Sequence, residues 1–298
     1  MKKILNLLFA LLLISGCSKS QNASVNPVST LTNTGLSKTG YLITFGFSQS
    51  NGTCRFTQSG NIAAKYTTTL SNCYTYYKST NNSSDNGVWQ QQKAGVNDQQ
   101  GTAQTGYFGV STFLAYRLDS MYNKSAYIIN SAVGGTYIAD DVNPSWNVLH
   151  SNQYYNTMIN YHFRPALAKL SVVLTPVLVI IHGESDSDTQ AHGQAYYQNM
   201  YDGIVKFRQD SGFPNMKVII TRLRSDYAGP PILGLPYVRQ AQLDLATNLP
   251  NVVIYDTDTA LSPLSSDGQH YNPIVGSYGG VKSAVNIGKG LADLISTY

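Results

Sequence analysis

The sequence predicts an α/β fold in which one parallel sheet of five strands carries helices on both faces. Two observations predict it: short runs of β-branched and other apolar residues, and stretches of helical periodicity between them. Runs that are apolar at nearly every position are typical of parallel strands buried on both faces. The runs are residues 41–47, 126–133, 176–182, 217–223 and 251–257.

Helical patterns lie between these runs, which indicates βαβ units and therefore a three-layer sandwich. In residues 109–122, for example, Phe113, Leu114 and Leu118 recur at helical spacing. The other predicted helices are residues 188–209, 235–248 and 283–296. Because no second linker and no internal repeat follows residue 40, we expect one domain over residues 40–298.

Residues 1–16 have the composition of a signal peptide. Two lysines precede a short apolar stretch, which is shorter than the ~20 residues of a membrane-spanning helix. The small residues before Cys17 resemble a bacterial lipobox, in which the cysteine is lipidated and becomes the new N-terminus; ordinary cleavage is the alternative. Residues 17–39, rich in Ser, Asn and Thr, are expected to form a flexible tether. The sequence thus predicts a lipid-anchored lipoprotein of the bacterial cell envelope, facing the periplasm or the surface.

The amino-acid composition indicates which kinds of molecule the protein binds. The formal net charge is +4, with no basic run, so the electrostatic footprint of a nucleic-acid-binding protein is missing. Charged residues make up only 12% of the chain, whereas 22 tyrosines and many Asn, Gln, Ser and Thr residues supply polarity. This composition suits an exported protein that contacts sugars.

The three cysteines also fit an exported protein. If Cys17 carries lipid, Cys54 and Cys73 remain, and in an oxidising compartment they are expected to form a disulfide. That bond would close a loop of about 20 residues and stabilise the fold by roughly 3 kcal/mol; two free thiols are the alternative. Because CxxC spacing is absent and the histidines are scattered, we predict no metal site and no cofactor.

Polar, small or titratable residues follow four of the five predicted strands. Because parallel sheets bind ligands at the carboxyl ends of their strands, these clusters are expected to meet on one rim. They are residues 48–52, 134–136, 182–186 and 266–270.

The clusters contain the groups that nucleophilic catalysis needs. A serine hydroxyl requires an adjacent base, which His270 can supply to Ser50. Asp267 precedes that histidine by three residues and can orient its imidazole. The backbone N–H groups of Ser50 and Gly135 are candidate donors to the oxyanion of a tetrahedral intermediate.

These residues resemble the motifs of the SGNH/GDSL hydrolase superfamily, and within it the sialate O-acetylesterase-like group and carbohydrate esterase family six. The resemblance runs in order from about residue 40 to the end. It includes a Gly-Gln-Ser-Asn nucleophile turn, an Ala-Val-Gly-Gly-Thr segment, a Gln-Gly-Glu-x-Asp segment, an Arg-x-x-Gln segment and a terminal Asp-x-x-His. The matching segments here are SQSN (48–51), AVGGT (132–136), HGESD (182–186), VRQAQ (238–242) and DGQH (267–270).

The resemblance implies a flavodoxin-like fold and a serine esterase. Ser50 would be the nucleophile, His270 the base and Asp267 its partner. Ser50, Gly135 and a third donor would form the oxyanion hole. His182 stands where the family has glutamine, so its imidazole N–H would be that third donor.

Two further details of these segments bear on the site. Ser185 is an alternative third donor, and Ser48 replaces the family's usual glycine. Glu184 is expected to be a hydrogen-bonding residue of the rim rather than an acid catalyst.

The expected function is removal of O-acetyl groups from a carbohydrate, either sialic acid or a polysaccharide. A catalytically inactive carbohydrate-binding lipoprotein and a general short-chain carboxylesterase are the alternatives. Sugar specificity is expected in residues 53–105 and 137–170. Trp89 and Trp146 either line a sugar cleft or pack in the core. Residues 185–190 are expected to cap a helix rather than to bind calcium.

Overall fold

The central element of the computed structural model is a seven-stranded sheet with the order β4-β3-β6-β1-β7-β8-β9. The structure describes residues 40–53, 57–58, 62–78, 87–97, 107–150, 154–228, 232–259, 264, 268–271 and 283–298. The strands of the sheet are β1 (Gly40–Phe45), β3 (Cys73–Tyr77), β4 (Val88–Gln91), β6 (Ser125–Asn130), β7 (Thr175–Ile181), β8 (Lys217–Arg222) and β9 (Val252–Asp256). A separate antiparallel pair joins β2 (Thr57–Gln58) to β5 (Tyr107–Phe108).

The prediction of an α/β fold is confirmed, but that of a five-stranded parallel sheet is wrong. The five predicted runs form β1, β6, β7, β8 and β9, whose neighbouring pairs are all parallel. Two further strands extend the sheet beyond β6. β3 joins in parallel, and β4 pairs with it in antiparallel orientation, so the sheet is mixed.

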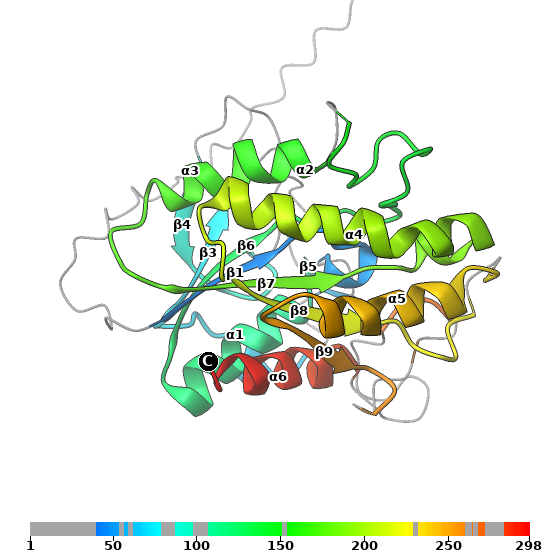
Figure 1. Cartoon of the computed structure of the whole chain (residues 1–298). Coiled ribbons are helices and arrows are strands. Elements are labelled where there is room, and N and C mark those ends of the chain that lie inside the picture. Colours follow the sequence, from blue (N-terminus) through cyan, green and yellow to red (C-terminus); the bar gives the residue numbers. More distant parts are fainter. Residues whose placement is uncertain are drawn as a thin grey trace, which may run out of the picture. The chain divides into compact units, whose positions relative to one another are not determined.

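Helices cover both faces of the sheet (Figure 1). α1 and α6 lie on one face, and α2, α3, α4 and α5 lie on the other. Met158–Phe163 forms one π-helical turn between α2 and α3. The helices are α1 (Val110–Tyr122), α2 (Tyr154–Thr157), α3 (Arg164–Leu167), α4 (Gln190–Ser211), α5 (Leu235–Asn248) and α6 (Ser283–Ile295).

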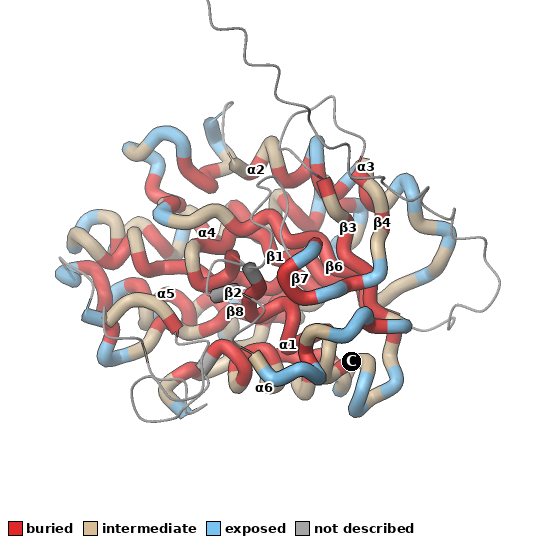
Figure 2. Tube along the Cα trace, turned by 180° about the vertical axis from the view of Figure 1, so that it is seen from behind, coloured by how far each residue is buried: buried red, intermediate tan, exposed pale blue. Residues whose placement is uncertain are grey.

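Successive residues of the strands point to opposite faces, so the sheet divides the core into two clusters. In β1, Leu42 packs with the residues of α4 and α5, and Ile43 packs with those of α1 and α6. Figure 2 shows that the strands are buried almost throughout, with exposed residues confined to the periphery. This double burial explains why the strand sequences are continuously apolar.

Several expectations concern residues outside the described ranges. These are the signal peptide, the lipidated Cys17 and its tether, Cys54 and Asp267. Among the helices that the structure describes, none is long and apolar enough to cross a membrane.

The predicted disulfide is not found. Cys73 is a free thiol at the start of β3, completely buried, and its Sγ lies 3.4 Å from the carbonyl oxygen of Ala115. It points into the core that α1 covers, where it packs as a small apolar side chain. Burial accordingly raises the pKa of this thiol.

Candidate active site

The turn after β1 is built by backbone and side-chain contacts to β7. Phe47 has a left-handed φ of 47°, which is rare for an aromatic residue and turns the chain sharply out of the strand. Ser48 Oγ then donates to the Gly46 carbonyl at 3.0 Å and accepts from the Ile181 N–H at 3.0 Å. The serine that replaces the family's glycine therefore holds the turn to the neighbouring strand, and the next turn, Ser50–Gly52, begins at the candidate nucleophile.

Ser50 and His270 meet at this rim although 220 positions separate them in the sequence. His270 Nε2 lies 3.0 Å from Ser50 Oγ, and both side chains are only partly buried. This distance is that of a hydrogen bond through which a proton can pass. Asp267, the expected partner of the imidazole, lies outside the described residues.

Asn51 fixes the position of the histidine segment relative to the nucleophile turn. Its side-chain oxygen accepts from the backbone N–H of Tyr271 at 2.9 Å. Its Nδ2 donates to Glu184 Oε1 at 2.6 Å and to the carbonyl of Gln269 at 3.1 Å. The backbone on both sides of His270 is therefore bound to the residue that follows Ser50. We did not predict this role. The sequence does not indicate that one amide side chain bonds three other residues, because those partners are distant in the chain.

Glu184, expected to be a hydrogen-bonding residue of the rim, accepts this bond from Asn51. Burial raises the pKa of its carboxyl group, while the Asn51 amide and nearby His270 lower it again. The hydrogen bond from Asn51 therefore stabilises the charged form of this buried carboxyl group against the effect of burial.

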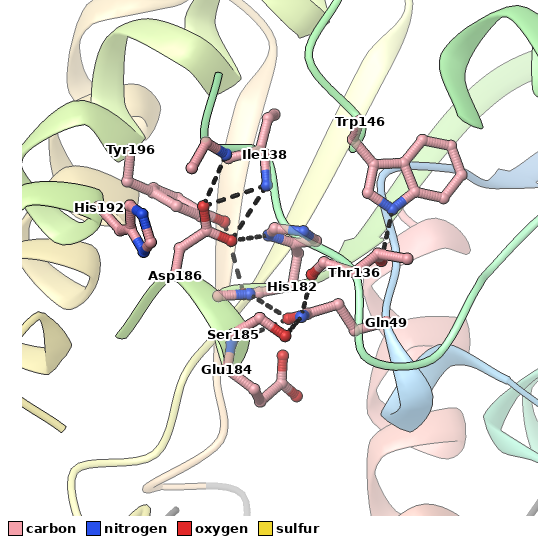
Figure 3. A network of polar contacts seen from close by, with 12 residues as sticks. Gln49, Thr136, Ile138, Trp146, His182, Glu184, Ser185, Asp186, His192 and Tyr196 are labelled. Carbon is pink, nitrogen blue, oxygen red and sulfur yellow. Dashed lines mark hydrogen bonds and ion pairs between the residues drawn. The ribbon is translucent and has the colours of Figure 1, made fainter. Parts of the chain in front are cut away.

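Gln49 links three segments of the rim (Figure 3). Its Oε1 accepts from the backbone N–H groups of Gly183 at 2.8 Å and Glu184 at 2.9 Å. Its Nε2 donates to Ser185 Oγ at 2.6 Å and to the carbonyl of Thr136. The amide that precedes the nucleophile thus orders the segments after β6 and β7, and it engages Ser185, the alternative third oxyanion donor.

Gly135 lies in the segment after β6. It has a left-handed φ of 69°, and a Cβ added there would meet no atom within 4 Å. The backbone is therefore open at the position from which its N–H is expected to serve the oxyanion.

His182 does not occupy the position expected of an oxyanion donor. Its side chain is completely buried, and its ring stacks on Tyr196 with the centroids 5.7 Å apart. Neither ring nitrogen has a hydrogen-bond partner among the described residues, and Nδ1 is 3.8 Å from Asp186. Burial lowers the pKa of His182 to about 3, so the ring is neutral and the contact is no ion pair. A ring with no exposed nitrogen cannot donate to a substrate from this position.

Asp186 holds the segment that follows Gly135. Its carboxyl oxygens accept from the backbone N–H groups of Ile138 and Ala139 at 2.9 to 3.1 Å (Figure 3). Burial raises the pKa of Asp186 to about 7, and the backbone donors oppose that rise. The carboxyl group of Asp186 is therefore engaged by backbone donors.

The same segment ends in the predicted helix cap. The side chain of Thr189 accepts from the backbone N–H of His192 at the start of α4. Within the described ranges no group of three His, Cys, Asp or Glu side chains could hold a metal ion.

Both tryptophans are core residues. Trp89 donates to the Ala166 carbonyl at 3.1 Å, and Trp146 donates to Thr136 Oγ1 at 2.8 Å. Their exposed fractions are 6% and 0%. Of the two readings left open, packing therefore describes Trp89, whereas Trp146 also lines a cavity beside the rim.

Comparison with solved structures supports the fold. A protein from Arabidopsis thaliana matches with a TM-score of 0.60 and 19% identity, covering 87% of this chain and 98% of that chain. NanS matches with a TM-score of 0.55 and 14% identity, covering 88% and 97%. A carbohydrate acetylesterase from Xanthomonas citri matches with a TM-score of 0.51 and 13% identity, covering 85% and 54%.

A search of curated protein sequences gives no significant match. The family model described as "Carbohydrate esterase, sialic acid-specific acetylesterase", however, matches residues 40–296, almost the whole described domain. The chain therefore belongs to this family of carbohydrate esterases, and its activity is of the carbohydrate O-acetylesterase class.

Proposed function

We propose that the protein is a serine O-acetylesterase that removes acetyl groups from sugar hydroxyls, and that a lipid on Cys17 anchors it in the bacterial cell envelope. The observation that carries the proposal is the 3.0 Å separation of Ser50 Oγ and His270 Nε2. Membership of the carbohydrate esterase family supplies the substrate class.

In the proposed reaction Ser50 Oγ attacks the acetyl carbonyl carbon, and its proton passes to His270 Nε2. The bond between the carbonyl carbon and the sugar oxygen then breaks. His270 returns the proton to that oxygen, which leaves as a hydroxyl, and the acetyl group remains on Ser50. A water molecule that gives its proton to the same imidazole attacks the acetyl-serine, acetate leaves, and Ser50 regains its hydrogen.

Negative charge develops on the carbonyl oxygen in each tetrahedral intermediate. The backbone N–H groups of Ser50 and Gly135 are the donors that we assign to it. Each such donor is typically worth ~100- to 1000-fold in rate. Asp267 would orient His270 and stabilise the imidazolium, as in other triads.

Substitution of the nucleophile and the base tests the proposal. Ser50→Ala and His270→Ala are each expected to lower kcat for p-nitrophenyl acetate by about 1000-fold or more, because each removes an essential step of proton or acyl transfer. Ser71→Ala and His150→Ala change exposed residues of the same types and serve as matched controls. Circular dichroism checks that each variant is folded.

The rivals predict different results. An inactive carbohydrate-binding protein would not react with a fluorophosphonate serine probe, whereas the proposed enzyme is labelled at Ser50. A general carboxylesterase would cleave octanoyl esters as well as acetyl esters. Retained turnover in a folded Ser50→Ala variant would refute the proposed mechanism.

A further inference from the structure

A cavity of about 280 Å³ lies beside the nucleophile turn, between residues 130–133 and the helical segment Tyr154–His162. Its size is near the lower limit of the ~300–1000 Å³ typical of small-molecule pockets. It therefore suits one ring-sized group rather than a chain of sugars.

Two residues that line the cavity are hydrogen-bonded to the turn that carries Ser50. Asn130 Nδ2 donates to the Gly52 carbonyl at 3.1 Å, and the Val133 N–H donates to the Ser48 carbonyl at 2.9 Å. Met158, on the opposite wall, packs closely against Gly46 directly after β1: a Cβ added to that glycine would lie 2.5 Å from Met158 Sδ. The wall formed by residues 130–133 is thus bonded to the backbone on both sides of the candidate nucleophile.

The lining combines apolar surface with neutral polar groups. Trp146, Val133 and Met158 supply the apolar surface, and Tyr154 lies against Trp146 with ring centroids 5.5 Å apart. Of the two rings only that of Tyr154 is partly exposed. Its aromatic surface suits the C–H face of a sugar ring, while hydroxyl and amide groups orient the sugar.

A buried hydrogen-bonded pair forms part of the same wall. Ser131 Oγ lies 2.8 Å from His162 Nδ1, and both side chains line the cavity. His162 is only 4% exposed, and its Nε2 has no hydrogen-bond partner in the part of the chain that the structure describes. It lies in a π-helical turn, a feature found frequently at functional sites. A buried polar atom without a partner is costly and commonly marks a ligand or water position.

The described side chains that line the cavity provide no positive charge for the carboxylate of an acidic sugar. Burial, together with nearby Lys78, lowers the pKa of His162 to about 3, so the imidazole is neutral. Lys78 does not line the cavity; its Nζ donates to the Tyr161 carbonyl at 3.3 Å. Among the described residues that line the cavity, none is Lys, Arg, Asp or Glu. A carboxylate placed here would be desolvated without a partner.

We propose that this cavity is a sugar subsite of the esterase and binds an uncharged pyranose ring, with His162 and Ser131 as specificity-determining residues. The proposal rests on the proposed function for the placement of the acetyl group beside Ser50. It implies that the substrate is an acetylated neutral glycan rather than an acetylated sialic acid, whose carboxylate finds no cation in this wall.

Binding is measured by calorimetry on Ser50→Ala protein, with monoacetylated xylobiose and 9-O-acetylated sialic acid as the two probes. We expect the neutral sugar to bind at least tenfold more tightly than the acidic one. Adding His162→Phe, which keeps the ring volume but removes both nitrogens, is expected to weaken xylobiose binding about tenfold. His150→Phe, at an exposed histidine, is the matched control and is expected to leave the Kd unchanged.

A second variant guards against misfolding of the first. Thr157→Phe enters the cavity from a partly exposed position and leaves the Ser131–His162 pair in place. In otherwise wild-type protein it is expected to lower the ratio of kcat/KM for acetylated xylobiose to that for p-nitrophenyl acetate about tenfold.

Tighter binding of the sialic acid probe, or unchanged xylobiose affinity and selectivity in both cavity variants, would overturn the subsite. The proposed function has a different test: it is refuted if the wild-type protein does not hydrolyse p-nitrophenyl acetate.

Discussion

At the scale of single residues, Asn51 and Gln49 organise a site whose chemistry belongs to other side chains. Each uses an amide as both donor and acceptor, and each joins segments from different strands. Such residues hold the candidate catalytic groups in position. The sequence marks them only as part of a short motif, because the partners of a side chain are decided by tertiary structure.

Asn51→Ala is expected to lower the free energy of unfolding by about 3 kcal/mol, because the buried Glu184 carboxyl and the Tyr271 N–H both lose a partner. Loss of alignment between Ser50 and His270 is expected to lower kcat for p-nitrophenyl acetate about 100-fold. Urea unfolding and steady-state kinetics measure the two effects. Asn72→Ala, which removes a half-buried amide bound to Asp119, is the control and should cost about 0.5 kcal/mol. A folded Asn51→Ala protein with wild-type kcat would exclude this positioning role.

At the scale of elements, the segment after β7 concentrates buried titratable groups. His182 and Asp186 are both completely buried, and their pKa values move in opposite directions, to about 3 and about 7. Between pH 3 and 6.5 the unfolded chain binds more protons at His182 than the folded chain, so this residue makes stability fall as pH falls. Asp186 has the opposite sign, since its folded form binds more protons between about pH 4 and 7.

Replacing His182 by Phe should therefore remove an acid-sensitive contribution while keeping a ring beside Tyr196. Each pKa unit corresponds to about 1.4 kcal/mol. When the pH is lowered from 6.5 to 4.5, the unfolding free energy of His182→Phe is expected to fall by roughly 2.3 kcal/mol less than that of the wild type. Urea titrations at the two pH values measure it, with His150→Phe as the control. Identical pH slopes in wild type and His182→Phe would show that the buried histidine is not the source.

The elements also show where sequence patterns suffice and where they do not. The five apolar runs and four amphipathic helices were found because both faces of the strands and one face of each helix are buried. β3 (CYTYY) was not recognised as a strand, because its tyrosines and threonine carry hydroxyl groups and the run does not look apolar. Four of its five residues are nevertheless buried. Tyr74, for example, stacks on Tyr127 with centroids 5.0 Å apart. The helical segment from α2 to α3 was missed because its irregular π-turn breaks the 3.6-residue period.

At the scale of the whole molecule, the sequence predicts which residues lie at the carboxyl edge of the sheet, because the ends of parallel strands meet there. Ser50 follows β1 and His270 follows β9. Both lie at the same edge of the sheet because the carboxyl ends of parallel strands share one edge, although β7 and β8 separate the two strands. The place of His182 could not be foreseen, because a position in a motif does not decide whether a side chain turns toward the rim or into the core.

The proposed anchor is likewise a property of the whole chain. Growth with a radiolabelled fatty acid is expected to label the full-length protein and not a Cys17→Ser variant, which lacks the thiol that carries the lipid. In cell fractionation, the Cys17→Ser variant is expected in the soluble fraction and the full-length wild-type protein in the membrane fraction. Equal labelling of both proteins would disprove lipidation at this cysteine.

The antiparallel hairpin of β3 and β4 has an evolutionary consequence. Ser50, Gly135, Glu184 and His270 follow β1, β6, β7 and β9, whereas the described residues of the hairpin contribute no member of this set. It lies at one margin of the sheet, beyond β6. The length of this margin can therefore change during evolution without moving Ser50, Gly135, Glu184 or His270.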